Sequence, residues 1–117
     1  PVAFAAGLAS LELLKPDQLL DQSAALAPHF QSVIHVLKTA KHVVDIRNCG
    51  LIGAIQLAAR DVDPSIRPFE VGTALWKAGF YVRFGGDCLQ FGPMFNSKPE
   101  DLSRLFAAVG DHSQKID

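Results

Sequence analysis

The stretch of sequence that decides the fold is GFYVRFGGDCLQFGP, residues 79–93. It contains two short apolar runs separated by Gly85-Gly86-Asp87, and it therefore predicts two strands joined by a tight turn. Arg83 lies just before this turn in an otherwise apolar strand. Its planar guanidinium is suited to binding a carboxylate, which can belong either to the protein itself or to a ligand. The residues alone leave both possibilities open.

The segments on either side of this hairpin complete the predicted fold. Helices are predicted over residues 2–14, 17–39 and 68–78 and after Ser97, and further strands over residues 43–46 and 51–57. Pro28 should kink or break the second helix. Leu75 and Trp76 should face the core, and Ser97 and Glu100 have the spacing of a capping box. Paired strands with short turns predict an α+β fold, a small, mostly antiparallel sheet with helices packed on one face.

Length and composition bound the possible functions. The 117 residues suffice for one domain, 1–117, and not for two. A hydrophobic fraction of 49% excludes a disordered chain, and a net charge of -1 with scattered basic residues predicts no nucleic-acid or membrane partner. No apolar stretch is long enough to span a bilayer. Cys49 and Cys88 are too few for a disulfide scaffold, so we expect two reduced thiols in a cytoplasmic protein, with Cys49 as a plain buried thiol and not a nucleophile.

The beginning of the sequence suggests a missing neighbour. The chain starts at Pro1, and its single methionine is Met94. The first predicted helix places Phe4, Leu8 and Leu11 on one face, but small apolar residues cover most of the rest. A helix that is apolar nearly all round must be buried on more than one side. We therefore expect these residues to be a fragment of a longer polypeptide.

Other candidate sites are weak when judged from the residues. The four histidines show no metal-ligand spacing; they are His29, His35, His42 and His112. The Gly-Gly-Asp turn leads into a strand and not a helix, so it lacks the helix N-terminus that binds phosphate. Asp61 and Asp63 lie in a loop together with Pro64, and this pattern indicates a solvated turn and not a cation site. Arg47 and Arg83 remain, each with an internal ion pair as the alternative to a ligand. No catalytic, cofactor-binding or metal-ligating residue is predicted.

Three stretches, which together span essentially the whole chain, resemble a known family. They are residues 1–9, residues 45–53, in which Asn48 replaces the commoner glycine of an Arg-Gly-x-Gly-Leu hairpin, and the region from Arg67 to Pro99. They resemble the C-terminal small domain of class III, fold-type I aminotransferases, which use pyridoxal phosphate. The third stretch is most similar to the ω-amino acid:pyruvate (β-alanine:pyruvate) branch.

The resemblance implies a function for the whole enzyme and a separate role for this domain. Enzymes of this branch move an amino group from an ω-amino acid or amine to pyruvate or another oxo acid, with the cofactor held by a lysine. No lysine of this chain matches that position, so we expect the chain to be inactive alone and to bind no cofactor by itself. Arg83 falls where the family has an arginine that pairs with the substrate carboxylate and swings away for uncharged amines. The implied partners are the missing large domain, a second subunit in a homo-oligomer, and the amino acid or oxo acid substrate.

A second interpretation belongs to a different functional class. The chain can be a free-standing α+β module, derived from an aminotransferase and used for binding or dimerisation. The reading frame upstream of the chain discriminates between the two interpretations. A large domain with a lysine in frame supports the first, and a stop codon followed by a local start supports the second.

Overall fold

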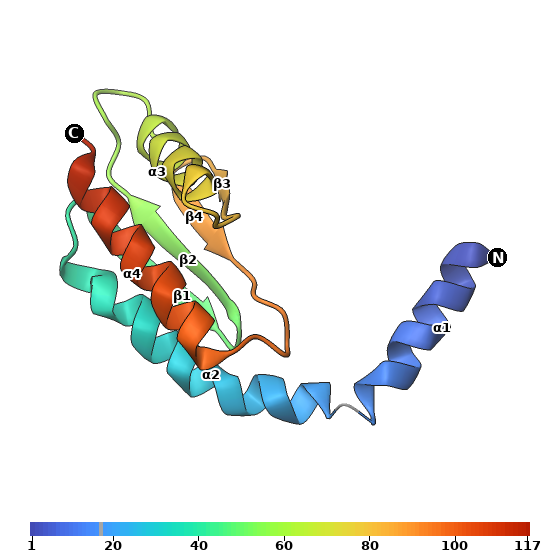
Figure 1. The fold of residues 1–117 in the computed structure, drawn as a ribbon. Coiled ribbons are helices and arrows are strands. Elements are labelled where there is room, and N and C mark those ends of the chain that lie inside the picture. Colours follow the sequence, from blue (N-terminus) through green and yellow to red (C-terminus); the bar gives the residue numbers. More distant parts are fainter. Residues whose placement is uncertain (17) are drawn as a thin grey trace.

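The order of helices and strands along the chain is the predicted one (Figure 1). The computed structural model describes residues 1–16 and 18–117. The elements are α1 (Val2–Leu14), α2 (Leu19–His35), the 3₁₀ turn η1 (Val36–Thr39), β1 (Val43–Cys49), β2 (Ile52–Leu57), α3 (Ile66–Lys77), β3 (Arg83–Gly85), β4 (Cys88–Phe91) and α4 (Pro99–Lys115). The predicted start of the second helix, Asp17, lies outside the described residues.

The strands form a sheet in the order β1-β2-β4-β3, and each neighbouring pair is antiparallel. Two-residue loops close both hairpins: Gly50-Leu51 joins β1 to β2, and Gly86-Asp87 joins β3 to β4. Gly50 and Gly86 have φ values of +56° and +57°, which glycine adopts at little cost. Helix α3 carries the chain from β2 to the far edge strand β3. The predicted α+β fold and the turn at Gly86 are therefore confirmed.

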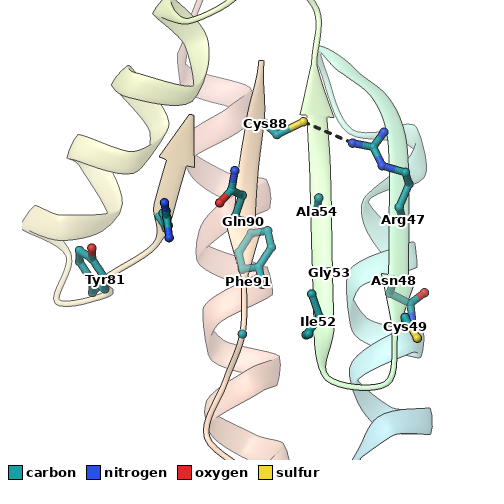
Figure 2. Close-up of a pocket in the computed structure, with 12 residues that line it drawn as sticks. Arg47, Asn48, Cys49, Ile52, Gly53, Ala54, Tyr81, Cys88, Gln90 and Phe91 are labelled. Carbon is teal, nitrogen blue, oxygen red and sulfur yellow. Dashed lines mark hydrogen bonds between the residues drawn. The ribbon is translucent and has the colours of Figure 1, made fainter. Parts of the chain in front are cut away.

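Helices α2, α3 and α4 cover one face of this sheet (Figure 1). Every second residue of each strand points toward these helices. Ile55 and Leu89 are two of these residues, and both are fully buried. Phe30 of α2 and Phe106 of α4 meet edge to face, with ring centroids 5.5 Å apart. Among the described residues, no helix lies on the opposite face of the sheet (Figure 1). The side chains at the alternate strand positions point to that face and line a site there (Figure 2).

Glycine at position 53 lets α2 approach β2 closely. A Cβ atom at Gly53 would lie 2.8 Å from Cδ1 of Ile34 and 2.9 Å from Cζ of Phe30. Both of those side chains are completely buried and have no space into which to move. A residue with a side chain at position 53 would therefore push α2 away from the sheet.

The end of α3 is a Schellman motif. The Phe80 N–H donates to the Leu75 carbonyl at 2.9 Å, and the Gly79 N–H donates to the Trp76 carbonyl at 3.0 Å. Gly79 itself has a φ of +89°. This geometry satisfies the free carbonyls of the last turn and ends the helix close to the predicted residue 78.

The predicted capping box of the last helix is wrong. Helix α4 begins at Pro99, and its N-cap is Lys98, with no side-chain cap. Proline favours the first helical position, since its fixed φ suits a helix and it has no N–H to satisfy. Pro99 therefore sets the start, and Ser97 lies one residue too far upstream to act as the cap.

Three smaller expectations also need correction. Trp76 is 64% exposed and does not face the core with Leu75. Helix α2 continues through Pro28, so of the two predicted outcomes, a kink or a break, the break does not occur. Cys49, predicted to be buried, is exposed at the end of β1, and Cys88 is the buried cysteine. The position of Cys49 follows from its place on the open face of the sheet, because alternate residues of a strand point to opposite faces.

Helix α1 stands away from the sheet and the other helices (Figure 1). None of its residues is buried, and Phe4 and Leu8 are 85% and 61% exposed. The helix is therefore formed as predicted, but the neighbour predicted to bury it is not among the described residues.

Candidate functional site

The open face of the sheet carries a hollow of about 740 Å³ (Figure 2). Residues from all four strands line it, and four of them form one continuous cross-strand row. Arg47 of β1 pairs with Ala54 of β2, Ala54 pairs with Gln90 of β4, and Gln90 pairs with Arg83 of β3. The fold thus brings together the two arginines that the sequence singled out, on one face and in one register.

Arg47 is held by a hydrogen-bond network within the protein. It donates from Nη1 to Asp45 Oδ2 at 2.8 Å and to Gln56 Oε1 at 3.2 Å, and from Nη2 to Cys88 Sγ at 3.5 Å. The bond to Asp45 is the main reason that the pKa of Arg47 is raised. For Arg47, the internal ion pair left open by the sequence is the observed state.

The network continues to the β3–β4 turn. The Cys88 thiol donates to Asp87 Oδ1 at 3.1 Å, and Gln56 Nε2 donates to Asp87 Oδ2 at 2.6 Å. Both bonds lower the pKa of Asp87, and the bond from the Cys88 thiol has the larger effect. The pKa of the Cys88 thiol is raised, mainly because the thiol is buried. A neutral thiol used as a hydrogen-bond donor is not an activated nucleophile. The network therefore rigidifies this end of the hollow.

Arg83 differs from Arg47 in having no such restraint. Its side chain is exposed and lines the hollow. Within residues 1–16 and 18–117, it makes no hydrogen bond or ion pair. The sequence suggested a cation enclosed by apolar neighbours, but the strand edge leaves it in contact with solvent. Its guanidinium is available to a carboxylate from outside the described chain.

Two residues of the hollow were missed by the analysis of the sequence. Gln90 lies between Ala54 and Arg83 in the row, and Tyr81 lines the hollow at its β3 end. Gln90 is the one exposed residue of β4, and its signal in the sequence was a polar side chain between the apolar residues Leu89 and Phe91. Tyr81 precedes β3, is 78% exposed and stacks edge to face on Trp76, with ring centroids 5.8 Å apart.

The remaining candidates lie elsewhere or serve the fold. His35 bonds Asn48 through Nε2 at 2.8 Å, and His29 contacts the start of α4 through Ser103 at 3.0 Å. Asp63 accepts hydrogen bonds from the backbone and hydroxyl of Ser65, as in a solvated turn. Over the described part of the chain, no group of three or more histidine, cysteine or acidic side chains is arranged to hold a metal.

In residues 1–16 and 18–117, no helix combines the length and the apolar character needed to cross a bilayer.

The fold defines the class of protein to which this chain is similar. It superposes on adenosylmethionine-8-amino-7-oxononanoate aminotransferase from Methanocaldococcus jannaschii with a TM-score of 0.87 and 21% identity, covering 96% of this chain and 27% of that one. It superposes equally well on the omega transaminase of Pseudomonas jessenii, with a TM-score of 0.87 and 22% identity over 98% of this chain and 27% of the other. The fold is that of the aminotransferase small domain. No family model matches the sequence.

Sequence relatives narrow the class to one branch. The chain is 66% identical over 111 residues to the β-alanine–pyruvate aminotransferase of Pseudomonas aeruginosa, covering 95% of this chain and 25% of the relative. It is 64% identical over 116 residues to the omega-amino acid–pyruvate aminotransferase of Pseudomonas putida, covering 99% and 26%. The chain is thus a relative of the ω-amino acid–pyruvate aminotransferases, as its resemblance indicated. It spans about a quarter of their length.

The lining of the hollow does not by itself fit pyridoxal phosphate. This cofactor is held in aminotransferases through a Schiff base to a lysine. No lysine lines the hollow among the described residues. Lys41, for example, donates instead to the Ile116 carbonyl at 2.7 Å, next to the last residue of the chain. No chemical step through the cofactor is therefore assigned to residues of this chain.

Proposed function

We propose that this chain is one domain of an ω-amino acid–pyruvate-type aminotransferase and that it recognises the substrate carboxylate through Arg83. The observation that carries the proposal is the unpartnered Arg83 guanidinium lining the hollow on the open face of the sheet. The identities of 66% and 64% to enzymes of this class support the assignment of the reaction. The chain covers 25% and 26% of those enzymes, and this supports a catalytic domain outside the chain.

The two arginines have different roles in this proposal. Arg83 forms a bidentate pair with a substrate carboxylate, because its planar fork matches the two carboxylate oxygens. Since no bond within the described chain holds it, its flexible side chain can turn away when the substrate is an uncharged amine. Arg47 is fixed by Asp45 and Gln56 and forms a rigid wall of the same hollow.

The rest of the chain supports this site and connects it to other parts of the enzyme. The missing large domain would supply the lysine and hold pyridoxal phosphate, which provides the electron sink for transamination. The apolar surface of α1, with Phe4 and Leu8 exposed, would pack against that domain or against a second subunit. The cytoplasmic location stays a prediction from the sequence.

The proposal is tested by replacing Arg83 in the full-length enzyme that carries this chain. Arg83→Ala should reduce kcat/KM for β-alanine by roughly tenfold or more, because a charge-assisted pair is lost, and should change kcat/KM for a primary amine without a carboxylate far less. Arg104→Ala is the matched control, since Arg104 is an exposed arginine of α4. Equal losses for the two kinds of substrate would contradict the proposal.

A further inference from the structure

Gln90 is the side chain next to Arg83 in the hollow. The two residues are direct partners in the β3–β4 pairing, and both face the side of the sheet without helices. Directly opposed residues of antiparallel strands have their Cβ atoms about 4.5–5.5 Å apart. One small group bound on this face can therefore touch both side chains.

The Gln90 amide is available in the same way as the Arg83 guanidinium. Four side chains with a charged or amide group line the hollow: Arg47, Asn48, Arg83 and Gln90. Arg47 is bonded to Asp45, and Asn48 is bonded to His35. Within the described residues, the side chains of Arg83 and Gln90 have no hydrogen-bond partner. The structure thus satisfies the polar groups at one end of the hollow and leaves two neighbouring ones free at the other.

The path of the Gln90 side chain brings its amide over β3. A Cβ atom built on Gly85 would lie 3.6 Å from Nε2 of Gln90. Gly85 and Arg83 are two residues apart on one strand, so they share a face. The absence of a side chain at Gly85 leaves room for the amide on the turn side of Arg83.

We propose that Gln90 is a second binding residue for the substrate carboxylate, donating a hydrogen bond from Nε2 to the carboxylate that Arg83 pairs with. This inference rests on the function proposed above. A carboxylate offers about four acceptor positions, and a bidentate arginine leaves some of them unused. The amide is also neutral, so it adds a bond to carboxylate substrates without placing a further charge against uncharged amines.

The test compares Gln90→Leu, which keeps the approximate size of the side chain and removes its donor, with the parent full-length enzyme. Loss of one hydrogen bond to a charged group should lower kcat/KM for β-alanine about tenfold and leave a carboxylate-free amine nearly unchanged. The inhibition constant of propanoate should rise by a similar factor, and that of propanamide should not. Gln114→Leu on the exposed face of α4 is the matched control.

A second variant, Gln90→Glu, introduces a negative charge at the same position. Gln90→Glu places a carboxylate beside Arg83, so it should reduce activity on β-alanine more than Gln90→Leu does. Gln90→Leu variants that retain the parent affinity for propanoate, or that lose activity equally on both substrates, would overturn the inference. Arg83→Ala separates the two proposals: if it discriminates between the substrates and Gln90→Leu does not, only the role of Gln90 fails. If Arg83→Ala does not discriminate, the proposed function fails as well.

Discussion

Arg47 and Arg83 occupy the two ends of a single cross-strand row, and only Arg47 is tied to the protein. The row crosses three strand-to-strand intervals, so their Cα atoms are separated by roughly 14 Å. Arg47 anchors a network that includes Asp45 and Cys88, whereas Arg83 is restrained by no bond within the described chain. The sheet therefore presents one fixed and one mobile cation to the same hollow.

This difference predicts different effects of the two arginines on stability. Arg47→Ala removes the bonds to Asp45 and Gln56 and should lower the midpoint of chemical denaturation of the 117-residue chain. Arg83→Ala removes no bond and should change the unfolding free energy by less than about 0.5 kcal/mol, as for most surface substitutions. Denaturant titrations of both variants check this. A stability loss for Arg83→Ala equal to that for Arg47→Ala would mean that Arg83 has a structural partner.

The close approach of α2 to β2 predicts that position 53 does not tolerate a side chain. Gly53→Ala places a methyl group against Phe30 and Ile34, which are buried and cannot yield, and it should cost about 1–3 kcal/mol of stability. Gly7→Ala is the control, because a Cβ at Gly7 meets nothing within 4 Å and lies inside α1. Alanine favours a helix interior over glycine by about 0.5–1 kcal/mol, so this control should not destabilise the chain. Parallel denaturation curves give both values.

Asn48, the residue at which this sequence departs from the hairpin pattern that it resembles, is hydrogen-bonded to a helix. Asn48, in place of the commoner glycine, accepts a hydrogen bond at Oδ1 from Nε2 of His35 on α2, at 2.8 Å. A double-mutant cycle with Asn48→Ala and His35→Ala should give a coupling free energy of about 0.5–1.5 kcal/mol, the usual net value of such a bond. Strictly additive effects would show that the bond makes no net contribution.

The Arg60–Glu70 pair predicts a specific loss of stability in acid. Two parallel bonds of 2.8 Å join their side chains, and the hydrogen bond from Arg60 lowers the pKa of Glu70. Because the folded-state pKa is below the unfolded value of about 4.3, the pair contributes fully above that value. Its contribution is lost as the pH falls through the folded-state pKa. The stability difference between the parent and Glu70→Gln should therefore be present at pH 7 and shrink on acidification below about pH 4, as denaturation over a pH series would measure; a constant difference would contradict it.

The composition of the hollow predicts the behaviour of the isolated chain. Since no lysine lines the hollow among the described residues, the 117-residue chain should form no stoichiometric, saturable complex with pyridoxal phosphate and should show no amino transfer. An absorbance titration with the cofactor and an assay with β-alanine and pyruvate check this. Stoichiometric binding with turnover would place the whole reaction within this chain.

The sequence identified the hairpins because their determinants are local. Glycines with positive φ at positions 50 and 86 fix the turns, and apolar spacing marks the helix faces. It failed at the start of α4, where Pro99 overrode the capping signal of Ser97. It also failed at Trp76, since a single residue at the margin of an apolar face can point either way.

By itself, the sequence determined the order of the elements, the family resemblance and Arg83 as the candidate for binding a carboxylate. Only the tertiary structure decided which arginine is free. Residues 47, 83 and 90 are distant along the chain, and strand pairing across the sheet places them in one row. Whether a cation is paired depends on the side chains that the fold brings within bonding distance. For Arg47 these include Asp45 and Gln56, whereas Arg83 has no partner within the described chain.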